Sequence, residues 1–482
     1  MLSLIISVFA LLLGYVLYGK LAEKIFGPDP ARTTPAISKA DGVDYIKLPG
    51  WKVFMIQFLN IAGTGPIFGA IMGAKFGPSA YLWIVFGCIF AGAVHDYFLG
   101  MLSVRNGGAG LPEVIGKYLG KGARSVMLGF SVVLLVLVGT VFVYSPALII
   151  GNMAGGTKTA IMLCVAAIFL YYLLATFLPI DKVIGRFYPV FAFALLFMAL
   201  ALFVGLLVKW PSIPEIWDGL ANMGPQAGVK GQPIFPCLFI TIACGAISGF
   251  HGTQSPLMAR CIDNEKLGRP VFYGSMITEG IVALIWAAVS SYFFFAGGAA
   301  EVGAASNAAA PTVVTAVSKG WLGVFGGILA ILGVVAAPIT SGDTALRSAR
   351  LIIADAVKLN QKKMGNRLII CLPVFAVTAA LLWFNIADEN GFNTIWRYFG
   401  WANQSLAAFT LWAVTVFLAR ERKGWSYLIS LIPACFMTAT CVTYIGIDKI
   451  GFNLPHSLIL SLALITNVIC VVLFYLWYYR KK

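Results

Sequence analysis

The sequence predicts an all-α polytopic membrane protein, arranged as a 5+5 inverted repeat with two discontinuous helices plus extra helices. Three observations support this fold class: the composition, the recurrence of long apolar runs, and two matched interruptions within those runs. Of the 482 residues, 60% are hydrophobic and 11% are charged, and the mean hydropathy is +0.89. Soluble globular domains are nearer half apolar and a quarter charged, so this composition excludes a soluble protein.

Apolar runs of about 20 residues, the length that spans a bilayer as a helix, recur from one end of the chain to the other. They predict about 13 transmembrane spans. The first run lacks a basic start and a small-residue cleavage site, so we expect a retained helix rather than a signal peptide. The runs cover residues 2–18, 52–76, 79–103, 124–150, 159–178, 186–208, 234–259, 270–297, 320–340, 366–385, 393–419, 425–445 and 455–479.

The net charge of +15 is distributed unevenly between the loops. When loops are assigned to alternating sides of the membrane, 27 of the 34 Lys and Arg residues fall on one side. Cytoplasmic loops hold the basic excess, so we expect the N-terminus outside and the C-terminus inside. The expected partners are therefore the lipid bilayer and a small-molecule substrate, with no nucleic acid. The sequence leaves the oligomeric state open.

The domain organisation follows from the runs and the loops between them. We expect an extra N-terminal helix with a cytoplasmic loop, two five-helix repeats separated by an external loop, and two C-terminal helices. These parts cover residues 1–50, 51–210, 211–233, 234–420 and 421–482, with the external loop at 211–233.

Two apolar segments are interrupted in their middles, at Gly63–Pro66 and between Gly249 and Pro256. Both carry Gly-Thr followed shortly by Pro, and the second opens the sixth of ten spans, so the two halves face opposite ways. Backbone groups in hydrocarbon must be paired, and a break persists only where protein or ligand supplies partners. The N-terminal N–H groups of a half-helix can hold a carboxylate, here on the half-helix that begins at Pro66. The alternative is that Gly and Pro only kink these helices.

Polar residues at the two breaks are the candidates for substrate binding, since they offer hydrogen bonds at the depth of the bilayer. The His at the second break could also carry a proton or simply tie down unwound backbone. The predicted substrate-binding residues are Asn60, Gly63, Thr64, Gly65, His251, Thr253, Gln254 and Ser255.

Ionisable residues inside the other spans are the candidates for ion or proton coupling, because each is costly in the membrane unless it is paired. His95 and Asp96 form either a proton relay or a structural pair, and Glu279 needs a buried partner or a proton. The oxygen-rich group Thr340, Ser341, Asp343 and Thr344 suits a sodium ion or a proton, with the first three as the coupling candidates. Its alternative role is to cap a helix that begins at Asp343.

The chain also resembles a known family, the carbon starvation protein CstA family of bacterial and archaeal inner-membrane carriers. The resemblance rests on residues 60–113, CGAISGFHGTQSPLMARC at 244–261, and APITSGDTALRSARL at 337–351. It implies a LeuT-like fold, uptake of peptides in some members and of pyruvate in others, and a proton as the coupling ion. The chain departs from the family pattern at Asn106, where His is common, and at Gly252, where Ala is common.

We therefore expect a secondary active transporter that imports small carboxylate-bearing nutrients across the cytoplasmic (inner) membrane of a prokaryote in response to carbon starvation. The alternatives are a sodium-coupled amino acid or organic acid carrier, a channel, and an intramembrane enzyme. No metal-spaced His/Cys cluster, nucleophile elbow or phosphate loop supports an enzyme. We expect no metal and no cofactor besides the coupling proton or sodium ion, and the nine cysteines are interpreted as small buried hydrophobic residues.

Overall fold

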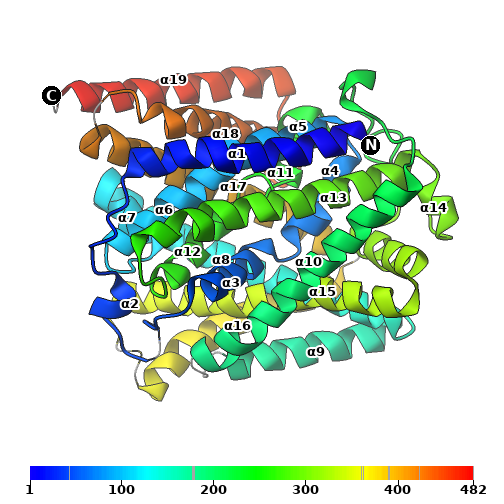
Figure 1. Cartoon of the computed structure of the whole chain (residues 1–482), viewed down its shortest axis with the longest axis horizontal. Coiled ribbons are helices and arrows are strands. Elements are labelled where there is room, and N and C mark those ends of the chain that lie inside the picture. The colour runs from blue at the N-terminus through cyan, green and yellow to red at the C-terminus, as the bar shows by residue number, and fades with distance from the viewer. Residues whose placement is uncertain are drawn as a thin grey trace.

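The computed structural model describes residues 1–480 except 43, 176–179, 360, 362, 389–390 and 423, with the side chains of 180–187, 325, 329 and 330 also left out. Every regular element in this described part is a helix (Figure 1), which confirms the all-α prediction. The helices are α1 (Leu2–Phe26), α2 (Pro35–Ser38), α3 (Gly50–Ala62), η1 (Gly65–Gly69), α4 (Ala70–Ala74), α5 (Ser79–Phe86), η2 (Gly87–Gly92), α6 (Ala93–Arg105), α7 (Leu111–Leu119), α8 (Lys121–Met153), α9 (Lys158–Ala175), α10 (Ile180–Lys209), η3 (Ile216–Asp218), α11 (Ile234–Thr241), α12 (Gly249–Ala259), η4 (Glu265–Leu267), η5 (Arg269–Gly274), α13 (Ser275–Phe295), α14 (Gly298–Glu301), α15 (Ala310–Val357), α16 (Met364–Ala387), α17 (Gly391–Glu421), α18 (Leu428–Ile447) and α19 (His456–Arg480).

Among the described residues, eleven helices are long and apolar enough to cross a membrane, or up to twelve if one bent pair counts as a single span. The chain is therefore a multi-pass membrane protein. Each predicted run coincides with a helix or a broken pair of helices, but α11 and α12 are each too short to cross alone. The count of thirteen spans, the domain boundaries and the orientation stay predictions.

The long helices form a bundle (Figure 1), and the helices differ in the share of their residues that is buried. In the most apolar windows of α1 and α19, 33% and 17% of the residues are buried, whereas the share is 83% for α17 and for the span that contains α13. The exposed residues of the outer helices are largely Leu, Ile, Val and Phe, which suits contact with lipid. Of the buried helices, α3 ends at the first interruption and α12 begins at the second, and α6, α12 and α13 carry Asp96, His251 and Glu279.

The first interruption lies where the sequence predicts it. α3 ends at Ala62, and the helix that follows over Gly65–Ala74 is bent by 51° relative to it. Gly63 takes a positive φ of 39°, and a Cβ added there would lie 2.6 Å from the ring of Phe142. Only glycine meets both constraints, because it has no Cβ. The break is therefore built into the residue type at this position.

The second interruption lies earlier in the chain than predicted. The prediction of a break between Gly249 and Pro256 is wrong, because α12 is helical from Gly249 to Ala259 and includes Pro256. The non-helical backbone covers residues 242–248 instead. The turn is made by Gly245, whose φ of 92° favours glycine. The chain thus has two discontinuous helices, α3 with η1–α4 and α11 with α12.

Candidate functional site

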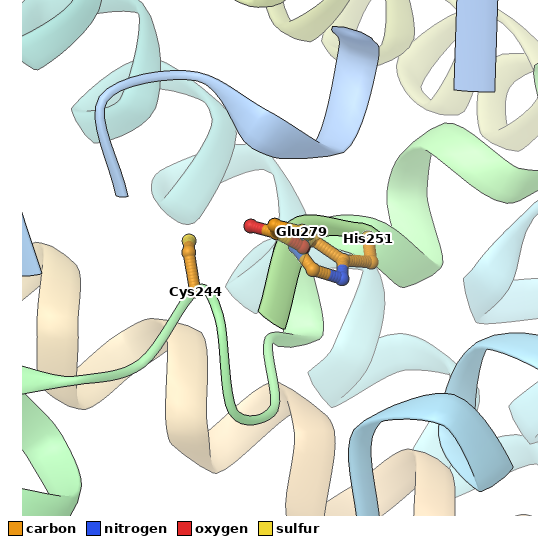
Figure 2. A group of neighbouring side chains, drawn as sticks. All are labelled: Cys244, His251 and Glu279. Carbon is orange, nitrogen blue, oxygen red and sulfur yellow. The ribbon is translucent and has the colours of Figure 1, made fainter. Parts of the chain in front are cut away.

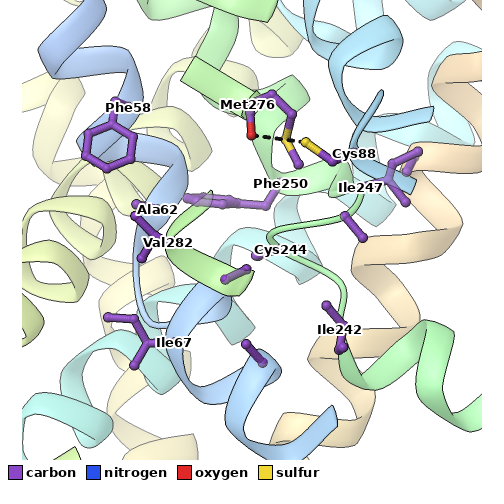
Figure 3. Packing of buried hydrophobic residues seen from close by; sticks show 14 of the residues in the cluster. Phe58, Ala62, Ile67, Cys88, Ile242, Cys244, Ile247, Phe250, Met276 and Val282 are labelled. Atoms are coloured by element: carbon purple, nitrogen blue, oxygen red, sulfur yellow. Dashed lines mark hydrogen bonds between the residues drawn. The ribbon is translucent and has the colours of Figure 1, made fainter. Parts of the chain in front are cut away.

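The two interruptions touch each other in the core. A Cβ added at Gly65 would lie 2.2 Å from the Cβ of Cys244, and one added at Gly245 would lie 3.6 Å from the Cα of Pro66. Figure 3 shows this region, where Ile67 follows the first break and Ile242, Cys244 and Ile247 belong to the second. Small residues at both breaks let the two backbones approach closely. The two breaks therefore lie in direct contact and form a single candidate site.

The start of α12 at the second break is capped by a residue from α17. The backbone N–H of Phe250 donates to Oδ1 of Asn403 at 2.7 Å, and the hydroxyl of Ser248 donates to the same oxygen at 3.0 Å. These bonds satisfy a helix terminus that would otherwise leave N–H groups unpaired. Sequence reasoning missed Asn403. The available signal was the amide pair Asn403-Gln404 inside the apolar run 393–419.

Asp96 on α6 joins two histidines. Its Oδ1 lies 2.7 Å from Nδ1 of His95, and its Oδ2 lies 2.9 Å from Nδ1 of His251 on α12. On the far side of the His251 ring, Nε2 lies 3.4 Å from Oε2 of Glu279 on α13. All four side chains are fully buried. Here they are called the buried ionisable chain, which runs from His95 through Asp96 and His251 to Glu279.

Sequence reasoning named these four residues but assigned His251 to substrate and the other three to coupling. The structure brings them together: His95 and Asp96 bond each other, and Asp96 also bonds His251 on a neighbouring helix. These contacts are those of a structural pair, and the proton relay stays a prediction. The π-helical turns η2 and η5 lead into the helices α6 and α13 that carry Asp96 and Glu279. Such turns are frequent at functional sites. Whether the buried ionisable chain carries protons stays a prediction.

Several of the predicted substrate-binding residues are buried with unsatisfied polar atoms. Among the described residues, both side-chain polar atoms of Asn60, Oγ1 of Thr64 and Oε1 of Gln254 have no hydrogen-bond partner. Leaving such a group unsatisfied costs about 1–3 kcal/mol. Asn60 and Thr64 come from α3 and the first break, and Gln254 comes from α12. These groups can accept and donate hydrogen bonds to a polar solute.

Other predicted substrate-binding residues use their polar atoms within the protein. The Thr253 hydroxyl donates to the carbonyl of Phe250 at 2.7 Å, and the Ser255 hydroxyl donates to the carbonyl of His251 at 3.0 Å. Both bonds lie within α12, so these hydroxyls mainly satisfy their own helix. Gly63 and Gly65 contribute only backbone. The part that each plays in substrate binding stays a prediction.

The oxygen-rich group on α15 is also buried, but it does not begin a helix. The alternative that it caps a helix starting at Asp343 is wrong, because α15 runs unbroken through this residue. The hydroxyl of Tyr188, which sequence reasoning missed, donates to Asp343 at 3.1 Å, and Arg347 lies 4.0 Å from its other oxygen. Ser341 donates to the carbonyl of Leu59 on α3 at 3.0 Å, so α15 is tied to the helix before the first break.

The Thr340 hydroxyl donates to the carbonyls of Ala336 and Ala337 on its own helix, each at 2.9 Å. Its oxygen is therefore engaged within α15. Within this group, the side chains of Asp343 and Ser341 bond other helices, α10 through Tyr188 and α3 through Leu59. Their role in coupling stays a prediction.

The fold is similar to solved transporter structures. The manganese transporter of Eremococcus coleocola, in complex with an aromatic bis-isothiourea compound, aligns with a TM-score of 0.51 at 13% identity, covering 91% of this chain and 98% of that chain. A mutant of the same transporter aligns with a TM-score of 0.54 at 13% identity over the same shares. At this identity the likeness concerns the fold alone.

Curated relatives extend the likeness to the sequence. The peptide transporter CstA of Escherichia coli is 26% identical over 91% of this chain and 79% of the relative. An uncharacterized membrane protein of Haemophilus influenzae is 48% identical over 60% of this chain and 90% of the relative. The pyruvate/proton symporter BtsT of E. coli is 28% identical over 58% of this chain and 46% of the relative.

The named relatives are transporters, and the chain is a membrane transporter and not an enzyme. The family model described as carbon starvation protein CstA matches residues 1–174, 152–320 and 296–444. These matches span most of the chain and include both interrupted helices and the buried ionisable chain. This protein therefore belongs to the carbon starvation protein CstA family.

Proposed function

We propose that the chain is a secondary active transporter that imports small carboxylate-bearing nutrients, short peptides or pyruvate, across the inner membrane of a prokaryote during carbon starvation. The observation that carries this proposal is the contact between the two broken helices, with unsatisfied polar groups and the buried ionisable chain beside it. The names of the relatives, a peptide transporter and a pyruvate/proton symporter, support this choice of substrates.

In this proposal the substrate lies at the two breaks. Its carboxylate binds the N-terminal end of the helix over Gly65–Ala74, and its other polar groups bind Asn60, Thr64 and Gln254. Each of these three residues has at least one buried polar atom without a hydrogen-bond partner among the described residues, which is a reason to bind a solute. The fold is proposed to be a LeuT-like inverted repeat, in which the broken helices rock against α8 and α15. The N-terminus lies outside and the C-terminus inside.

Protons are proposed to drive the import through the buried ionisable chain. A protonated His251 can pair with Asp96 on one side and with Glu279 on the other, which joins α12 to α6 and α13. Loss of this proton removes both ion pairs and leaves two buried carboxylates facing a neutral ring, so the packing of α12 depends on protonation. Asp343 with Tyr188 and Arg347 is a second candidate for coupling, to a proton or to sodium.

Uptake by the purified full chain in liposomes tests this function. Labelled pyruvate is compared with labelled di- and tripeptides under an inward proton gradient, an inward sodium gradient, or no gradient. We expect saturable accumulation of one of these substrates against its own gradient when protons are supplied. Accumulation driven by sodium alone would favour the sodium-coupled alternative, and flux that only equilibrates the solute would indicate a channel.

A further inference from the structure

Three side chains with different metal-binding atoms meet beside the second break. Cys244, His251 and Glu279 offer a sulfur, a ring nitrogen and a carboxylate oxygen that all lie within 4.8 Å of one another (Figure 2). Their exposed fractions are 1%, 0% and 0%. We propose that these residues form a binding site for a soft divalent transition-metal ion, Zn²⁺. The proposed function uses His251 and Glu279 for proton coupling, but it includes neither Cys244 nor a metal ion.

Two of the three ligand groups lack hydrogen-bond partners. Among the described residues, Nε2 of His251 and both carboxylate oxygens of Glu279 have no hydrogen bond, and Nε2 and Oε2 lie 3.4 Å apart. The Cys244 sulfur makes long contacts with the Ser248 hydroxyl at 3.5 Å and with the Asn403 amide nitrogen at 3.9 Å. Buried polar atoms without partners are uncommon in folded proteins, and an ion is one of the explanations for them. A bound metal ion would satisfy the nitrogen and the carboxylate at the same time.

The His251 ring is held as metal-binding rings commonly are. Its other nitrogen, Nδ1, lies 2.9 Å from the Asp96 carboxylate, and Asp96 is in turn bonded to His95. A carboxylate that accepts from one ring nitrogen fixes the tautomer whose second nitrogen carries a free lone pair. Asp96 therefore leaves Nε2 as the ligand atom and orients it. This arrangement orients His251 independently of Cys244 and Glu279.

Charge and ligand type favour zinc over harder ions. A thiolate and a carboxylate together neutralise a divalent cation, so the ion and its three ligands carry no net charge among them. Thiolate sulfur selects zinc over manganese and magnesium, which prefer oxygen. In a tetrahedral zinc site the ligand atoms are roughly 3.3–3.8 Å apart. Because the three ligand atoms here all lie within 4.8 Å of one another, each separation needs to close by no more than roughly 1–1.5 Å on binding. Cys244 lies in the non-helical segment 242–248, where such a shift breaks no helix.

The ion would connect three separate elements. Cys244 belongs to the second break, His251 to α12 and Glu279 to α13. A metal bound to all three fixes the break relative to both helices. Zinc is therefore inferred to arrest the transport cycle, and this consequence, unlike the binding itself, rests on the proposed function.

Metal binding by the purified, detergent-solubilised full chain tests the site. Zn²⁺ is titrated by equilibrium dialysis, and Cd²⁺ is added as a probe whose bond to a thiolate absorbs in the ultraviolet. We expect one ion per chain, no competition from Mn²⁺ or Mg²⁺, and a loss of zinc affinity of at least roughly tenfold in Cys244→Ala. Cys237→Ala is the matched control, since Cys237 is buried on α11 outside the group. It should bind like the wild type.

Absence of the cadmium–thiolate absorption in the wild type would overturn the site, and so would unchanged zinc affinity in Cys244→Ala. Cys244→Ser, which keeps the side-chain volume, covers the case in which the alanine variant fails to fold. In liposomes, zinc should inhibit uptake by the wild type and Cys237→Ala but not by Cys244→Ala. Zinc binding without inhibition would overturn the arrest of transport, whereas a wild type without any uptake would contradict the proposed function and leave the binding result intact.

Discussion

Asp96 shows how much one buried carboxylate can organise. Its two oxygens hold two histidines, one on its own helix and one that is 155 residues away in the chain. A charged group with both oxygens engaged is stable in a dry interior, where an unpaired one is not. The same bonds orient His251 toward Glu279. The residue therefore positions a titratable group without any exposure to water in this conformation.

Asp96→Asn tests the proposed proton coupling. The amide keeps the volume but removes the charge that stabilises a protonated His251. Hydrogen bonds to charged groups contribute about 1.5–3 kcal/mol, so we expect proton-driven uptake in liposomes to fall at least roughly tenfold. Exchange of labelled for unlabelled substrate at equal pH should fall less. Asp263→Asn, which changes a partly exposed carboxylate paired with Lys47, is the control. An equal loss in both assays would contradict a coupling role.

Thr64→Val tests the proposed substrate contact at the first break. Valine has nearly the same shape, and the hydroxyl that it removes has no partner in this structure. We expect the folded protein to be no less stable and the apparent affinity for substrate to weaken by about 2- to 12-fold, the equivalent of one neutral hydrogen bond. Thr410→Val is the control, because that hydroxyl bonds the carbonyl of Leu406 on its own helix. Unchanged affinity in the Thr64 variant would remove this residue from the site.

At the scale of secondary structure, the two broken helices are in contact at their breaks, and the residues at each break permit this contact. The first break ends α3 at a glycine that no other residue type can replace without strain, and the second begins α12 under a cap from α17. Gly65 and Gly245 remove the side chains that would keep the two breaks apart. The first discontinuity is therefore fixed by its own glycine, whereas the second also depends on a cap from a distant helix.

Gly65→Ala tests this contact. The added methyl group would overlap Cys244, and overpacking of this kind typically costs about 1–3 kcal/mol. We expect a lower melting temperature of the purified protein and reduced uptake. Gly129→Ala on α8 is the matched control, since a Cβ there meets nothing within 4 Å. It should leave the melting temperature unchanged or raise it, because alanine favours a helix. Equal stability of the two variants would contradict close contact of the breaks.

The orientation in the membrane is a property of the whole molecule, because it depends on the basic residues of all the loops together. The basic excess of one set of loops predicts that residue 230 lies outside and residue 266 inside. Lys230 and Lys266 are both exposed, so both positions suit labelling. In intact cells, a membrane-impermeant thiol reagent should label Lys230→Cys and not Lys266→Cys. Labelling of both should follow once the membrane is opened. The reverse pattern in intact cells would contradict the predicted orientation.

Some properties of the whole molecule are determined by single segments of the sequence, without contacts between segments. Membrane insertion follows from the length and apolarity of single segments, so α1, α8 and α19 are evident without a structure. The first break is also local, because Gly63 and Pro66 act on their own backbone. The polar residues of the candidate site were recognisable one by one, since ionisable groups within apolar runs are rare.

By itself, the sequence determined the class of protein, the position of the first break and most members of the candidate site. Only the tertiary structure decided that His95, Asp96, His251 and Glu279 form one chain, because they come from three helices far apart in sequence. It also decided that the second break lies at residues 242–248 rather than at Pro256. The physical reason is that a helix begins where its unpaired N–H groups find partners, and Asn403 supplies that partner from a distant helix.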